Sequence, residues 1–228
     1  WKTVEGIEKA FESIFLHNVD GIIAWDYHEC LAREKIPAVI YGAEIPGFDA
    51  VMQDYAFSSE TTVKYLLELG HVEIGYLGPL EDPRAEFLRQ NLEEARLPVR
   101  EEWFIPAKGT LPGGNDAMPE FLSLKKRPTA LVAQNDSIAA GAMFCAIRSG
   151  IRIPEDLSVI GFNNTVAAAF TLPPLTTFNT HTNDLADALV DLLMKRLETP
   201  DMPVQVSKIR PELVIRESCK SITEKEVK

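Results

Sequence analysis

The chain has 228 residues, and 46% of them are hydrophobic, enough to bury the core of one large domain or two small ones. Its 23 Lys and Arg against 34 Asp and Glu give a formal net charge of −11. This balance argues against a segment that holds nucleic acid by itself, because such affinity comes mostly from clustered Lys and Arg. No apolar run approaches the roughly 18 residues of a membrane helix, and the first residues lack a signal-peptide pattern. We therefore expect a soluble, cytoplasmic protein.

Strand and helix patterns alternate along the chain. Short apolar runs predict strands, and apolar residues at intervals of three and four predict helices. The predicted strands are residues 19–25, 36–41, 51–53, 72–77, 103–106, 130–133, 157–162 and 175–179, with residues 204–215 extended. The predicted helices are residues 1–17, 61–69, 83–95, 116–124 and 184–197.

Three further segments complete this reading. Asp136 is expected to cap a helix that ends at Gly150. Residues 111–115, Leu-Pro-Gly-Gly-Asn, have the composition of a turn. Residues 218–228 are charged and show no periodicity, so they are expected to form a frayed tail.

Alternating strands and helices predict an α/β fold with doubly wound parallel sheets. The strands at residues 130–133 and 157–162 are each followed by a short polar cluster, which begins at Asn135 and Asn163 respectively. In open parallel sheets, ligands bind outside the carboxyl ends of the strands. These clusters are therefore the first place to look for a binding site.

Several phrases of this sequence resemble one known family. They are PTALVAQND (residues 128–136), GIRIPEDLSVIGFNNT (150–165) and PPLTT (173–177), preceded by VDGIIAW (19–25), IPAVIY (36–41), Val51 with Asp54, and ELGHVEIGYLG (68–78). In this order and at these spacings the chain is similar to the effector-binding core of the lactose/galactose-repressor (LacI/GalR) family of bacterial transcription regulators. The similarity covers nearly the whole chain, from about Glu8 to Arg216.

The resemblance implies two subdomains of the periplasmic-binding-protein-like type, with a ligand bound in the cleft between them. The N-terminal subdomain would comprise residues 1–56 and 180–204, the C-terminal one residues 57–179 and 205–217, and the tail residues 218–228. The family's first strand, helix and second strand, and its helix-turn-helix headpiece and hinge, have no counterpart in this sequence. We expect a fragment of a longer gene product, in which residues 19–25 form an open sheet edge.

The resemblance also nominates polar ligand residues. Residues 84–92, RAEFLRQNL, align with the family's R-x-x-G-F-x-x-A-L, and Arg84 matches the arginine that reaches sugar hydroxyls or acidic groups. Its alternative is a solvated helix arginine, and Phe87 replaces the family's glycine. Asn135 matches a strand-end asparagine and contacts either the ligand or its own backbone. Asn163 stands where many sugar-responsive members have aspartate, and such a change removes a charged acceptor.

Two aromatic residues are further candidates. Trp25 ends a strand, and is expected either to stack on the face of a sugar or to fill the core. Phe170 precedes Pro173 and either walls the binding site or packs in the core. Relatives often carry a stacking aromatic near Leu111, and this sequence has none there.

Catalytic and metal sites find no support. His17, His28, His71 and His181 are scattered without metal-ligand spacing, and His71 is expected to be structural. Cys30, Cys145 and Cys219 are odd in number and far apart, as for reduced thiols. There is no nucleophile elbow, P-loop or dinucleotide fingerprint. No enzyme activity, cofactor or metal is predicted.

The leading hypothesis is therefore the effector-sensing, dimerising domain of a transcriptional repressor, which would contact DNA only through a headpiece. The resemblance implies a homodimer and a small, sugar-like effector. The alternatives are a solute-binding protein of a sugar transporter, which shares the two-lobed fold, and a small-molecule enzyme.

Overall fold

The computed structural model describes residues 19–25, 31 and 36–222 of the chain. They form two compact units. Unit 1 comprises the described residues up to Gln53 together with His181–Ile209, and unit 2 comprises Asp54–Thr180 and the described residues from Arg210 onwards. The helix predicted at residues 1–17 lies outside the described part of the chain.

Unit 1 is a four-stranded parallel sheet with one described helix against it. The strands are β1 (Ile22–Trp25), β2 (Ala38–Tyr41), β3 (Asp49–Gln53) and β9 (Val206–Ile209), in the order β1-β2-β3-β9. Helix α7 (Thr182–Glu198) buries Leu185, Leu189 and Leu192 against Val39 and Val51. Within the described residues β1 is the end strand of the sheet, as predicted.

An ion pair between Asp49 and Arg196 joins the helix of unit 1 to its sheet. Arg196 donates from Nε to Asp49 Oδ2 (2.7 Å) and from Nη2 to Oδ1 (2.8 Å), and Asp49 is 2% exposed. Nη1 of Arg196 also donates to the carbonyl oxygen of Met202 (2.6 Å). Burial alone would raise the pKa of Asp49, but the hydrogen bonds from Arg196 and Gln205 outweigh it and lower that pKa.

Unit 2 is built on a second parallel sheet. Its strands are β4 (Ile74–Leu77), β5 (Phe104–Ile105), β6 (Ala130–Ala133) and β7 (Ser158–Ile160), in the order β5-β4-β6-β7. Strands β8 (Thr177–Asn179) and β10 (Glu212–Val214) form an antiparallel pair. The strands predicted in this region are all present, and β6 has the predicted bounds.

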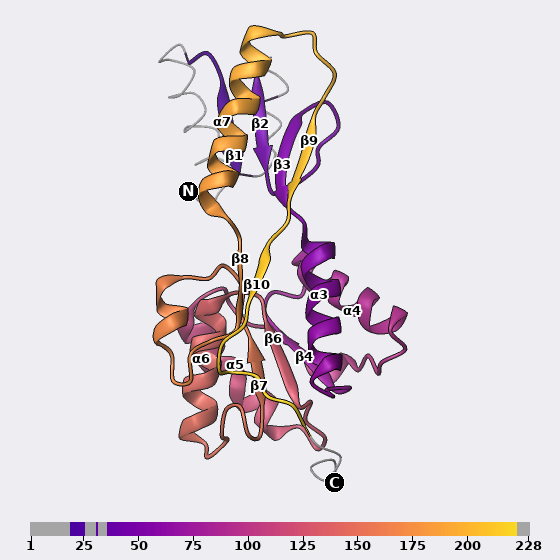
Figure 1. Cartoon of the computed structure of the whole chain (residues 1–228), viewed down its shortest axis with the longest axis vertical. Helices are drawn as coiled ribbons and strands as arrows, with labels where there is room; N and C mark the ends of the chain where they lie inside the picture. Colours follow the sequence, from indigo (N-terminus) through magenta and orange to yellow (C-terminus); the bar gives the residue numbers. More distant parts are fainter. Residues whose placement is uncertain (1–18, 26–30, 32–35, 223–228) are drawn as a thin grey trace. The chain divides into compact units, whose positions relative to one another are not determined.

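Helices cover both faces of the unit 2 sheet (Figure 1). Helices α3 (Tyr55–Glu68) and α4 (Pro83–Glu94) share one core with Tyr76, Trp103 and Phe178. Helices α5 (Leu111–Ser123) and α6 (Asp136–Arg148) share another with Leu77, Leu131 and Val159. Short 3₁₀ turns lie at Glu101–Trp103 and Val166–Phe170 (η2). The predicted doubly wound α/β class with two parallel-sheet subdomains is confirmed.

The turn predicted at residues 111–115 is wrong. Helix α5 begins at Leu111, with the Thr110 hydroxyl accepting a hydrogen bond from Gly113 N. The glycines serve helix packing here, because a β-carbon at Gly114 would collide with the backbone of Ile138, and one at Gly141 with the backbone of Leu111. Close contact between α5 and α6 therefore overrides the turn-forming composition.

The frayed tail predicted from residue 218 onwards is also wrong for its described part. Ser218 is fully buried, and its hydroxyl donates to the carbonyl oxygen of Val159 (2.6 Å) and accepts from Thr176 N (2.8 Å). Val159 N in turn donates to the carbonyl oxygen of Ser218 (2.8 Å). The segment thus pairs with the backbone of β7, which composition and periodicity do not reveal.

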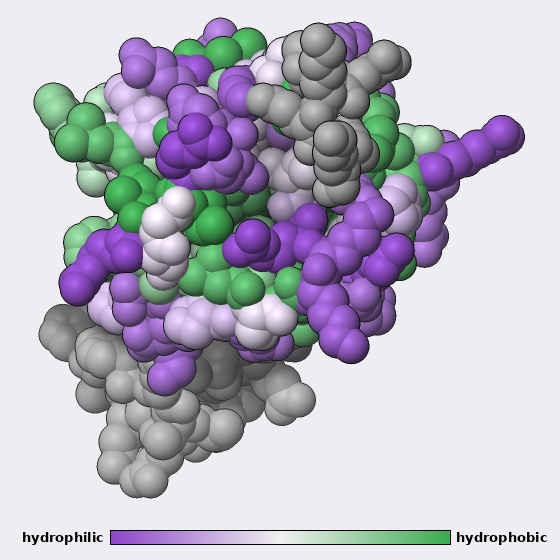
Figure 2. All heavy atoms as spheres, turned by 90° about the horizontal axis from the view of Figure 1, so that it is seen from below, coloured by the Kyte–Doolittle hydropathy of each residue, from purple (hydrophilic) through white to green (hydrophobic). Residues whose placement is uncertain are grey.

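Hydrophilic and hydrophobic side chains both reach the surface seen in Figure 2. Val166, Phe170 and Leu172 are 79% to 82% exposed. No helix among the described residues is long and apolar enough to cross a membrane.

Candidate ligand-binding site

The order of the strands in unit 2 places a switch point between β4 and β6. From β4 the chain passes through α4 to β5 on one side, and then through α5 to β6 on the other. The carboxyl ends of β4 and β6 are therefore adjacent, and the two crossover connections that follow β4 run in opposite directions along the sheet. Open α/β sheets bind ligands at such a point. The loop after β4 leads to Asp82, and β6 is followed by Gln134 and Asn135.

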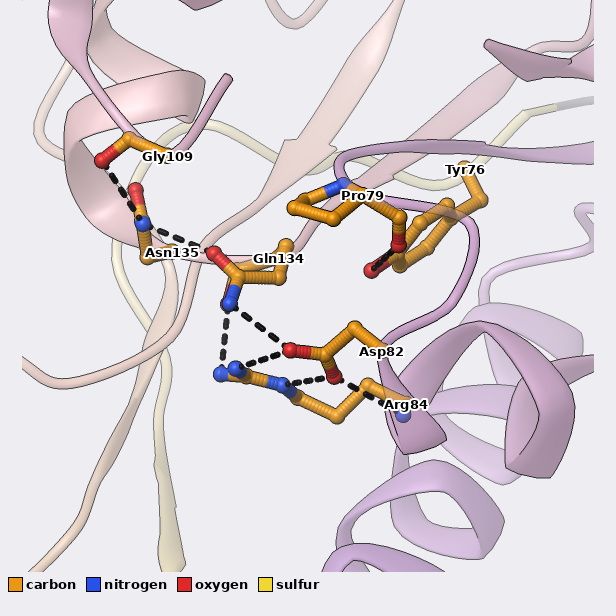
Figure 3. Close-up of polar contacts among 7 residues, drawn as sticks. All are labelled: Tyr76, Pro79, Asp82, Arg84, Gly109, Gln134 and Asn135. Atoms are coloured by element: carbon orange, nitrogen blue, oxygen red, sulfur yellow. Dashed lines mark hydrogen bonds and ion pairs between the residues drawn. The ribbon is translucent and has the colours of Figure 1, made fainter. Parts of the chain in front are cut away.

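Arg84 lies at this switch point and binds both loops (Figure 3). Its Nε and Nη2 each donate to one carboxylate oxygen of Asp82, both at 2.8 Å, and Nη1 donates to the carbonyl oxygen of Gln134 at 2.8 Å. The guanidinium carbon lies 4.9 Å from the ring centre of Tyr55 and 5.2 Å from that of Phe162. The two ring centres lie 5.8 Å from each other, so the guanidinium lies beside both rings and is not stacked between them. These ring contacts and the three hydrogen bonds hold the planar cation in a fixed orientation.

Local sequence explains the position of Asp82. Asp82 is the N-cap of α4 and accepts a hydrogen bond from Arg84 N (3.0 Å), while Pro83 occupies the first helical turn. The Asp82 and Arg84 side chains are only 17% and 16% exposed. Burial would raise the pKa of Asp82, yet the hydrogen bonds and charge of Arg84 outweigh it and lower that pKa. Both groups are therefore charged at neutral pH.

Asn135 continues the polar network. Its Nδ2 donates to Gln134 Oε1 (2.7 Å) and to the carbonyl oxygen of Gly109 (3.3 Å), and Gln134 Nε2 donates to Asp82 Oδ2 (3.0 Å). Arg84 and Asn135, nominated separately from the sequence, are thus joined through Gln134 and Asp82.

The helix cap predicted at Asp136 is wrong. Asn135 is the N-cap of α6, because its Oδ1 accepts a hydrogen bond from Ile138 N (2.8 Å). Asp136 is 2% exposed and accepts hydrogen bonds from the hydroxyls of Thr165 and Thr177. Asp136 therefore holds the loop after β7 in place. Asn and Asp are both common N-cap residues, so the sequence alone does not show which of Asn135 and Asp136 caps the helix.

Asn163 follows β7, the strand next to β6. Its backbone is in the left-handed region (φ 104°), and its N–H donates to the carbonyl oxygen of Phe178 (3.0 Å). The side chain is exposed, whereas that of Asn164 accepts a hydrogen bond from Arg216 Nη2 (2.6 Å). Asn163 lies at the same sheet edge as Arg84 and Asn135, with its amide directed away from the core.

A small cavity adjoins Arg84. Its volume is about 30 Å³, and its lining includes Tyr55, Ser59, Gln134 and Phe162. This volume is large enough for one or two water molecules and too small for a sugar. A larger ligand would contact the polar rim instead of entering the cavity.

The two aromatic candidates are both exposed, so the core alternative is wrong for each. Trp25 ends β1 in unit 1, is 81% exposed, and meets Tyr41 edge-on with ring centres 4.7 Å apart. Phe170 ends η2 in unit 2 and is 79% exposed. Trp25 belongs to the other unit than Arg84, and no contact among the described residues of unit 2 joins Phe170 to Arg84.

Sequence reasoning missed four members of the site: Asp82, Gln134, Tyr55 and Phe162. A signal existed for Asp82, because Asp followed by Pro at the start of a predicted helix is an N-cap pattern. The two aromatic residues gave no comparable signal, since they come from segments distant in sequence.

His71 is structural, as predicted. The buried ring lies with Nδ1 2.8 Å from the Thr129 hydroxyl, and with Nε2 3.0 Å from the Ser158 hydroxyl and 3.1 Å from the carbonyl oxygen of Lys220. No group of three or more His, Cys, Asp or Glu among the described residues could hold a metal ion.

The fold is that of a known class of domain. The family described as "Periplasmic binding protein-like domain" matches residues 63–219. Two relatives are named "HTH-type transcriptional repressor PurR". That of Haemophilus influenzae is 35% identical over 96% of this chain and 70% of its own length. That of Mannheimia succiniciproducens is 32% identical over 95% of this chain and 69% of its own length.

A solved structure has the same fold. A transcriptional regulator described as LacI, from Bacillus cereus subsp. cytotoxis, superposes with a TM-score of 0.91 over 98% of this chain and 84% of its own, at 22% identity. The chain belongs to the LacI/GalR family of transcriptional regulators and corresponds to its C-terminal, effector-binding domain.

Proposed function

We propose that this domain senses a small polar effector, a sugar or sugar derivative, and thereby controls DNA binding by a helix-turn-helix headpiece of the whole regulator. The observation that carries the proposal is Arg84 at the switch point of unit 2, which lies beside the rings of Tyr55 and Phe162 and is hydrogen-bonded to two loops. A site built on strand ends and held this firmly is preorganised for a ligand.

The chemistry of the rim suits hydroxyl groups. The contacts to Asp82 and Gln134 use three of the five guanidinium N–H groups of Arg84, so two remain for a ligand. Asn163 adds an amide that donates and accepts, and vicinal hydroxyls match such alternating partners. Trp25 and Phe170 are proposed contacts that would supply an apolar face to a sugar ring.

Control of DNA binding is proposed from the relatives, whose names include both the HTH type and the repressor role. An effector acts by binding one conformation of its domain better than another, and thus shifts their populations. The formal charge of −11 fits a domain that leaves DNA contact to another segment. These relatives favour a regulator over a transporter's solute-binding protein, and over an enzyme.

We further propose that the domain is a homodimer. Val166 and Leu172 expose large apolar side chains within seven residues of sequence. Exposed apolar surface of this kind is typical of protein contacts.

The experiment is a thermal-unfolding screen of neutral sugars, sugar acids and sugar phosphates, followed by calorimetric titration. A true ligand at 100 times its dissociation constant stabilises the domain by about 2.7 kcal/mol. Arg84→Lys keeps the charge but loses the planar fork, so the affinity should fall by at least about tenfold with the fold intact. Arg148→Lys, on the exposed end of α6, is the matched control and should leave the affinity unchanged. Absence of stabilisation by every compound would contradict the proposal.

A further inference from the structure

The positive charge of Arg84 is already neutralised inside unit 2. Asp82 accepts from Nε and Nη2 of Arg84 at 2.8 Å each, in a bidentate pair that is more than four-fifths buried. In a pair of this geometry the carboxylate cancels most of the electrostatic potential of the guanidinium. Arg84 then acts on a ligand mainly as a hydrogen-bond donor.

The other charges at this end of the unit 2 sheet also occur with opposite signs. Burial raises the pKa of Asp136, and the nearby charge of Arg216 acts against that shift. Glu81 and Lys108 are exposed, carry opposite charges and follow β4 and β5 respectively. Asp54 and Arg210 lie 3.7 Å apart at the start of α3. Arg84 and Arg210 at this end of the sheet thus each have a carboxylate partner, Asp82 and Asp54 respectively.

An anion bound to Arg84 would therefore face a carboxylate. The free N–H on Nη2 belongs to the nitrogen that already donates to Asp82 Oδ2, so an anion there would lie about 5 Å from that oxygen. Like charges at such a distance repel, and the two buried groups receive little screening by salt. A neutral hydroxyl meets no such penalty.

We propose that Asp82 sets the ligand class of this site: by pairing with Arg84, it selects an uncharged, hydroxyl-bearing ligand and excludes phosphates and carboxylates. The inference rests on the proposed ligand-binding function and goes beyond it, because the family alignment leaves Arg84 free to bind either hydroxyls or acidic groups. Asp82 is thus a specificity-determining residue.

The direct test uses inorganic phosphate as the probe, so it does not depend on the effector. Asp82→Asn keeps the size of the side chain and an oxygen that can cap α4, while it removes the negative charge. Thermal unfolding is followed against phosphate concentration, with chloride holding the ionic strength constant. Phosphate should stabilise Asp82→Asn at least about tenfold more effectively than the wild-type chain.

Two further variants locate the effect. Glu81→Gln removes the adjacent, exposed negative charge and should leave phosphate binding at the wild-type level. Adding Arg84→Gln to Asp82→Asn should abolish the additional stabilisation by phosphate, because the guanidinium that binds phosphate is then absent. Should Asp82→Asn fail to fold, Asp82→Ser retains an N-capping oxygen and takes its place.

The second arm titrates matched pairs of neutral sugars and their phosphates. The wild-type chain should prefer the neutral member, and Asp82→Asn should shift the preference toward the phosphate. Wild-type preference for the phosphate, or equal phosphate binding by all variants, overturns the inference and leaves an effector-sensing role standing. If no sugar binds but the phosphate response follows Asp82 and Arg84, the charge-setting role holds and the sugar-binding function fails.

Discussion

His71 shows how one buried side chain can join segments far apart in sequence. It precedes β4, and its ring reaches the Thr129 hydroxyl before β6, the Ser158 hydroxyl in β7 and the carbonyl oxygen of Lys220. Burial lowers the pKa of the imidazole, although the hydrogen bond to the Lys220 carbonyl oxygen acts against that shift. An isolated histidine in the sequence gave no hint of these partners.

Acidification should therefore weaken unit 2 through His71. Because its folded pKa lies below the unfolded value of about 6.5, the unfolded chain binds the proton first. The stability is present above about pH 6.5 and is lost as the pH falls below it toward the folded pKa. Urea unfolding between pH 7.5 and 5 measures this slope, which should be shallower in His71→Gln. Ser158→Ala should lower the stability but keep the slope, and identical slopes in all three proteins would rule out this role of His71.

Some residues of the candidate site could be predicted from the sequence. Arg84 and Asn135 were predicted from aligned phrases, and the structure joins them. Asp82 and Gln134 act through a side chain and a backbone carbonyl, and their pairing depends on the switch between β4 and β6. Spacing along the chain carries no such information.

At the scale of elements, α5 and α6 pack more closely than their composition suggests. Gly114 of α5 and Gly141 of α6 allow backbone to approach backbone between the two helices. The strands and the amphipathic helices were predictable, because burial imposes a period on each. The start of α5 was not, because its glycines serve a neighbouring helix and not a turn.

Gly141→Ala should destabilise unit 2 by about 1–3 kcal/mol, although alanine is the better helix former by about 1 kcal/mol. The added methyl group meets the backbone of Leu111, which cannot turn aside as a flexible side chain could. Urea unfolding provides the measurement. Ser137→Ala, on the exposed first turn of α6, should change stability by less than about 0.5 kcal/mol. A Gly141→Ala variant as stable as wild type would show that the helices can separate at no cost.

At the scale of the whole molecule, the chain runs three times between two units, each with its own parallel sheet and cores. Neither unit is continuous in sequence, so their composition alone gives no boundary. The sequence also does not show that Val166, Phe170 and Leu172 are exposed on unit 2, because apolar residues at this spacing could equally belong to the core.

The proposed homodimer should depend on Val166 and Leu172. Replacing both by Glu places two like charges where a partner would bury apolar side chains, and should raise the dimer dissociation constant at least about a hundredfold. Sedimentation velocity over a range of protein concentrations measures it. Val72→Glu is the control: Val72 is 46% exposed but precedes β4, whereas η2 follows β7, so it lies at the opposite end of the parallel sheet. A wild-type chain that stays monomeric at every concentration, or a double variant that dimerises equally well, would remove this surface as the dimer contact.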